Sequence, residues 1–128
     1  MTDHRHAYRR IRLVRARGVW ARLRGLLGRA RPLGWRTGLW LSPCWAVHTF
    51  GMQYPIDVAF IGRDGCVLCL IRHLVPGRIA FFWGAASVIE LRANPMDSSL
   101  RYRRRLHIAL RKARDCRMLL SWRKPRGC

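Results

Sequence analysis

The strongest local constraint in this sequence is the dipeptide Asp64-Gly65, which separates the apolar segments DVAFI (57–61) and CVLCLI (66–71). An Asp-Gly pair between such segments is typical of a two-residue β-hairpin turn, because both central residues of a type I′ turn need positive φ angles. The register that follows pairs Asp57 with Arg72, Ala59 with Leu70, and Ile61 with Leu68. Both faces of this hairpin are apolar, so we expect it to be covered twice and to be central rather than an edge.

The rest of the chain predicts further strands and two helices. Ile11 and Leu13 alternate with arginines, which predicts a first strand ending near Ala16, and apolar residues at helical spacing predict a short amphipathic helix over 19–30. From residue 37 to residue 91, short apolar segments separated by turns predict a sheet. After Asn94-Pro95, Ser98 is expected to cap a basic helix running from about Ser99 to Trp122.

These elements predict an α+β fold. We expect a small, strongly bent, mostly antiparallel sheet or barrel-like domain with one short N-terminal helix and a C-terminal basic helix. The single globular domain is predicted over residues 1–93, and residues 94–128 are predicted to form a basic, helical C-terminal extension.

Charge is distributed unevenly along the chain. Residues 1–36 hold eleven arginines and one acidic residue, residues 37–91 three arginines and three acidic residues, and residues 92–128 twelve basic and two acidic residues. The net charge of +20 therefore comes from the two flanks. Basic flanks attract nucleic acid or an anionic surface by counterion release, although 24 arginines against two lysines also match the coding bias of a GC-rich genome.

The sequence also bears on compartment and cofactors. The N-terminal residues form no apolar signal segment, and the uncharged apolar run of residues 79–89 is too short to span a bilayer. Five cysteines, an odd number, fit a reducing compartment, so we predict a cytoplasmic protein without a transmembrane segment. Cys66 and Cys69 have the spacing of a redox or zinc pair but lie in a predicted strand on opposite faces, so no metal or cofactor is predicted.

The stretch PCWAVHTFGMQYPIDVAF (43–60) contains the candidate site residues. Strand alternation places His48 and Met52 on one face and Thr49 on the other, and Asp57 follows the corner formed by Pro55. The candidate ligand corner comprises His48, Thr49, Met52 and Asp57. The structural alternative pairs Asp57 with Arg72.

The ordered segments RLRGLLGR, GLWLSPCWAVHTFGMQYPIDVAFIGRDGCVL, LVPGR and ASVIEL resemble the domain of unknown function 192 (DUF192) family over about residues 10–93. The resemblance implies one compact α+β domain with a strongly bent sheet and implies no activity. Relatives continue after the Glu-Leu strand with a turn, a short helix and a closing strand, which the basic tail of this chain lacks. The supporting motif residues that it indicates are Arg24, Gly25, Arg29, Pro55 and Glu90.

Three functions are consistent with the sequence. The first is a cytoplasmic binding or accessory module, without assigned catalysis, for a small ligand or a protein partner at the ligand corner. The second is an electrostatic binder of nucleic acid or anionic surfaces through its basic flanks, with Arg101, Arg103, Arg104 and Arg105 as the candidate anion-binding residues. The third is an enzyme that uses Cys44 and His48 with Asp57 or Glu90.

Overall fold

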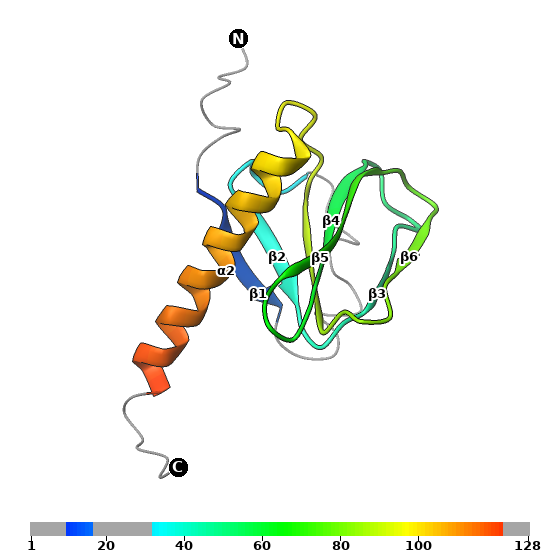
Figure 1. The fold of residues 1–128 in the computed structure, drawn as a ribbon. Helices are drawn as coiled ribbons and strands as arrows, with labels where there is room; N and C mark the ends of the chain where they lie inside the picture. The colour runs from blue at the N-terminus through cyan, green and yellow to red at the C-terminus, as the bar shows by residue number, and fades with distance from the viewer. Residues whose placement is uncertain (1–9, 17–31, 122–128) are drawn as a thin grey trace.

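The computed structural model describes residues 10–16 and 32–121, with side chains as far as residue 115. In this part of the chain, a five-stranded sheet with the order β1-β2-β7-β4-β5 lies between a helix and a two-stranded sheet (Figure 1). The five strands are β1 (Arg12–Ala16), β2 (Thr37–Leu41), β4 (Ile56–Ile61), β5 (Val67–Leu74) and β7 (Ser87–Arg92). The two-stranded sheet, here called the ribbon, pairs β3 (Ala46–His48) with β6 (Ile79–Phe81), and the helix is α2 (Ser99–Ser121).

The predicted α+β class and the mostly antiparallel sheet are confirmed. β1 and β2 run parallel, and the other pairings of the described strands are antiparallel. Strand pairing among the described residues does not close the sheet into a barrel, because β1 and β5 are its edges. The first strand and the C-terminal helix lie where they were predicted, whereas the helix predicted over residues 19–30 lies outside the described residues.

The centre of the sheet is β4, whose six residues are all buried. Their side chains alternate between two apolar clusters, one on each face of the sheet. The helix-side core contains Ile11, Ala59, Ile61, Val67, Ile89, Leu91, Tyr102, Leu106, Ala109 and Leu110. The ribbon-side core contains Leu33, Leu39, Leu41, Val47, Ile56, Val58, Phe60, Ala80 and Val88. Double coverage is therefore confirmed for β4, but the expected central position is wrong for β5, an edge strand.

The turn between β4 and β5 is longer than the predicted two-residue turn. Gly62 donates its amide to the Cys66 carbonyl at 2.9 Å, so residues 63–65 form a three-residue loop. Gly65 adopts a φ of 82°, as expected for a type I turn followed by a left-handed residue. The Asp64 carboxylate accepts the Cys66 amide at 3.0 Å, and this hydrogen bond lowers the pKa of Asp64.

The longer loop changes the register near the turn. Ala59 faces Leu70 as predicted. Beyond a shift between Phe60 and Ile61, however, Ile61 faces Val67 rather than Leu68. The predicted pairing of Ile61 with Leu68 places Val67 on the other face of the hairpin by strand alternation, whereas in the structure Val67 belongs to the helix-side core.

The helix α2 begins at the predicted cap. Ser98 Oγ accepts the Arg101 amide at 3.3 Å, and the Ser98 carbonyl accepts the Tyr102 amide at 2.9 Å. The helix buries Tyr102, Leu106 and Leu110 in the helix-side core. This packing favours a single unit that includes the start of the tail, and the domain boundary at residue 93 stays a prediction.

α2 also covers both edges of the sheet, since it contacts β1 and β5. At the β5 edge, the Val67 amide donates to His107 Nε2 at 3.1 Å, and Arg103 Nη1 donates to the Val67 carbonyl at 3.2 Å. These side chains satisfy backbone groups that an edge strand would leave open. Among the described residues, no helix is long and apolar enough to cross a membrane.

Candidate functional site

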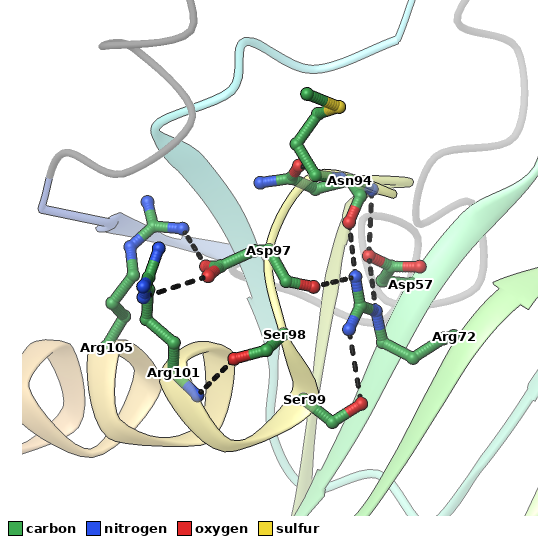
Figure 2. Close-up of polar contacts among 9 residues, drawn as sticks. Asp57, Arg72, Asn94, Asp97, Ser98, Ser99, Arg101 and Arg105 are labelled. Carbon is green, nitrogen blue, oxygen red and sulfur yellow. Dashed lines mark hydrogen bonds and ion pairs between the residues drawn. The ribbon is translucent and has the colours of Figure 1, made fainter.

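Asp57 is the centre of a polar junction that joins β4, β5 and the segment before α2 (Figure 2). The Asp57 side chain is 1% exposed and accepts the amides of His73 at 2.8 Å and Asn94 at 3.0 Å. Arg72 Nε lies 3.4 Å from Asp57 Oδ2. The predicted pairing of Asp57 with Arg72 is thereby confirmed.

A β-bulge brings Arg72 to this position. The register between β4 and β5 shifts between Ile56 and Val58, so that both Arg72 and His73 lie opposite Asp57. His73 has a φ of 57°, a left-handed conformation that residues other than glycine adopt rarely. Its amide is held by Asp57, which explains how the bulge is maintained.

Arg72 in turn binds the chain that enters α2. Its Nη2 donates to the carbonyls of Asn94 and Asp97, and its Nη1 donates to Ser99 Oγ at 3.2 Å (Figure 2). The guanidinium also lies 4.8 Å from the centre of the Tyr102 ring. With so many of its donors engaged inside the protein, Arg72 has a structural role at the junction.

The predicted anion-binding arginines of α2 do not converge on one anion site. Arg105 forms an ion pair with the buried Asp97 at 2.7 Å, and Arg101 Nε lies 3.9 Å from the same carboxylate. Arg103 binds the backbone of β5, and Arg104 is exposed.

The ligand corner is divided by the sheet. Asp57 contacts the helix side, whereas Met52 packs against the ribbon-side core. Thr49 is fully buried: its hydroxyl donates to the Val75 carbonyl at 2.7 Å and accepts the Arg78 amide at 2.9 Å. His48 is exposed on the ribbon, so the structure does not bring the four residues together.

The residues of the enzyme hypothesis are likewise dispersed. Cys44 donates its thiol to the Ala46 carbonyl at 3.1 Å, at the start of the ribbon. Glu90 is buried in β7, and Asp57 lies in the junction. Within residues 10–16 and 32–121, no cluster of three or more His, Cys, Asp or Glu residues has the geometry to hold a metal ion. Pro55 directly precedes β4, while Arg24, Gly25 and Arg29 lie outside the described residues.

A basic groove, with a volume of about 830 Å³, lies between β1, β2 and α2. Its apolar lining includes Leu13 and Trp40, and Arg15 stacks over the Trp40 ring at 4.8 Å. The described residues that line it include no Asp or Glu. Its six cationic residues are Arg10, Arg12, Arg15, Arg36, Arg105 and Lys112.

Comparison with known proteins places this fold in a family. A family model for DUF192, described as an uncharacterized ACR, matches residues 1–101. The chain belongs to the DUF192 family. No curated protein matches the sequence of this DUF192 chain.

Two solved structures share the fold of this DUF192 chain. A protein of unknown function from Novosphingobium aromaticivorans is 23% identical with a TM-score of 0.58, over 66% of this chain and 64% of its own. A "putative transcription regulator" from Sinorhizobium meliloti is 23% identical with a TM-score of 0.56, over 63% of this chain and 67% of its own. The chain thus spans less than two thirds of the Novosphingobium protein.

Sequence reasoning missed several residues that matter in this DUF192 protein. Asn94 and Asp97 complete the junction from the segment predicted to be an extension. The sequence analysis interprets Asn94-Pro95 only as a break in the chain. An Asn side chain can also form a local turn with the backbone two residues later, and here Asn94 Oδ1 accepts the Met96 amide at 3.2 Å. The groove was missed because its walls are distant in sequence.

Because of Tyr102, the stability of the protein is expected to fall as pH rises in the alkaline range. Burial, and then the Asp57 carboxylate, raise the pKa of Tyr102 above its ordinary value of 10.0. Below that pH the phenol is protonated in both states, and above it only the unfolded chain ionises, so stability falls as pH rises. The slope from this group should be about half of 1.4 kcal/mol per pH unit at pH 10 and should approach about 1.4 kcal/mol per pH unit above it. Urea unfolding at about pH 9 to 11 should show a shallower loss for Tyr102→Phe; identical slopes would contradict this account.

Proposed function

We propose that this DUF192 protein is a binding module that holds single-stranded nucleic acid in the basic groove. The observation that carries the proposal is the set of six cationic residues on the walls of the groove, with no acidic residue among the described lining residues. Arg105 shares its charge with Asp97, which leaves an excess of positive charge along β1, at Arg36 and at Lys112. Such an array binds phosphates with little dependence on base sequence.

The apolar lining favours a single strand over a duplex. Trp40 and Leu13 lie among the cations, so unpaired bases can contact apolar surface while the phosphates face the arginines. A duplex keeps its bases stacked inside and offers only its backbone to the groove. The Sinorhizobium protein, which shares the fold, is described as a putative transcription regulator, and this description is compatible with a nucleic-acid ligand in either form.

Charge reversal in the groove tests the proposal. Arg12→Glu/Lys112→Glu removes two phosphate contacts and adds repulsion, so affinity for a mixed-sequence single-stranded oligonucleotide should fall about a hundredfold at low salt. For the unsubstituted protein, log affinity against log salt should have a slope of about −3 to −4. Fluorescence anisotropy over a salt series measures both quantities.

A matched variant separates the groove from net charge. Arg63→Glu/Arg78→Glu makes the same change in charge at exposed positions outside the groove, and should bind nearly as tightly as the unsubstituted protein. Equal losses in the two variants would show attraction to net charge alone and would overturn the proposal. Tighter binding of a duplex of the same sequence would refute the role of the apolar lining.

A further inference from the structure

The outer face of the ribbon carries exposed apolar side chains. Cross-strand pairing sets His48 opposite Ile79, and Val47 opposite Ala80 on the other face. Val47 and Ala80 are buried in the ribbon-side core, whereas Ile79 is 64% exposed. The face with His48 and Ile79 therefore points away from the main sheet.

Aromatic rings extend this surface. Phe81 is 60% exposed, Phe50 51% and Trp83 82%. Trp83 stacks on Trp45, with ring centres 5.1 Å apart, and Phe50 lies 5.6 Å from the His48 ring. The aromatic face comprises His48, Phe50, Ile79, Phe81 and Trp83.

Charge is almost absent from the segments that build the aromatic face. Residues 42–55 and 75–86 contain one Arg, Arg78, and no Lys, Asp or Glu, although 25% of the whole chain is charged. Arg78 is exposed and directly precedes Ile79 at the edge of the face. One cation is too few to bind a nucleic acid along this surface, and the exposed apolar rings favour a partner with an apolar interior.

We propose that the aromatic face inserts into the interfacial layer of an anionic membrane. Tryptophan favours that layer because its ring contacts acyl chains while its indole N–H remains near water, and phenylalanine and isoleucine add apolar area that contacts the acyl chains. The net charge of +20 attracts the protein to anionic lipid, and Arg78 lies where it reaches headgroup phosphates. The same charge makes two copies of the chain repel each other, which argues against a second copy as the occupant.

This membrane site is independent of the proposed nucleic-acid site. The ribbon and α2 lie on opposite sides of β4 (Figure 1). The basic groove borders α2 and β1, so a membrane-bound molecule presents its groove to the solution. The two surfaces can therefore be disabled separately.

Vesicle binding with a fluorescence readout tests the membrane site. The probe is a vesicle of phosphatidylcholine and phosphatidylglycerol in which the phosphatidylcholine carries brominated acyl chains that quench tryptophan. At raised salt, which screens the basic groove, the unsubstituted protein should remain bound and be quenched. Ile79→Ser/Phe81→Ser keeps every tryptophan as a reporter, and should lower the vesicle partition coefficient about tenfold for each residue and abolish quenching.

Three results would overturn the membrane site. The first is tryptophan quenching in the double variant equal to that in the unsubstituted protein. The second is complete release of the unsubstituted protein from the vesicles at raised salt, with no quenching. The third is a dimer of the unsubstituted protein in sedimentation velocity that the two substitutions dissociate. A circular-dichroism spectrum and a cooperative urea transition like those of the unsubstituted protein verify the fold of the double variant; if it fails to fold, the single variant Phe81→Ser provides the same comparison with about a tenfold effect. The groove variant Arg12→Glu/Lys112→Glu should still be quenched by the vesicles at raised salt. Failure of the groove proposal can therefore be distinguished from failure of the membrane proposal.

Discussion

A chain that stops at Ala93 is expected to lose cooperative unfolding. The helix-side core would lose Tyr102, Leu106 and Leu110, each of which is at most 2% exposed. Burying a side chain of this size contributes about 1.5–3 kcal/mol, so the three together rival the total stability of about 5–15 kcal/mol that is usual for a domain. Urea unfolding followed by circular dichroism measures the loss.

A longer truncation is the control. A chain that stops at Asp115 keeps the three core residues and the polar junction, and should unfold cooperatively with a midpoint close to that of the full chain. Cooperative unfolding of the chain that stops at Ala93 would instead show that residues 94–128 are a separate extension, as the sequence alone predicts.

Asp57→Ala is expected to destabilise the protein by about 3–5 kcal/mol, because it leaves a partly buried Arg72 without its carboxylate partner. Two buried backbone amides, those of His73 and Asn94, would also lose their acceptor. The loss of the His73 contact removes the bond that holds a left-handed residue in the bulge. Chemical denaturation gives the change in free energy of unfolding.

Two further variants decide whether the ion pair is responsible. Asp64→Ala removes a carboxylate that also accepts a backbone amide, but at an exposed turn, and should cost much less. Asp57→Ala/Arg72→Ala removes both charges, and its loss of stability should be smaller than the sum of the losses of the two single variants. If the loss of stability in the double variant equals the sum of the losses in Asp57→Ala and Arg72→Ala, the two residues are not coupled and this account is wrong.

Local patterns predicted the elements well where one residue type decides the outcome. Ser98 marked the start of α2, alternating apolar residues marked β1, and a continuous apolar segment marked β4. Asp64-Gly65 marked the turn but not its length, because Gly at a left-handed position suits a three-residue loop as well as a two-residue one. That one-residue difference moved Val67 to the other face.

The candidate site was harder to predict, because it depends on which face of the sheet each segment covers. Asp57 and Thr49 are close in sequence, yet β4 and the ribbon place them on different sides. Trp40 and Lys112 are far apart in sequence and line one groove. Alternation gives the face of a residue within a strand, but only the packing of α2 and the ribbon identifies what lies against that face.

The contact of α2 with both edge strands has a consequence during synthesis. β1 and β5 are made before α2, so the nascent sheet emerges from the ribosome with its outer strands able to pair with those of neighbouring chains. Incomplete chains that end before α2 would keep both edges open and would therefore be prone to aggregate. α2 therefore acts as a cover that reaches the edges of the sheet only when synthesis of the chain is nearly complete.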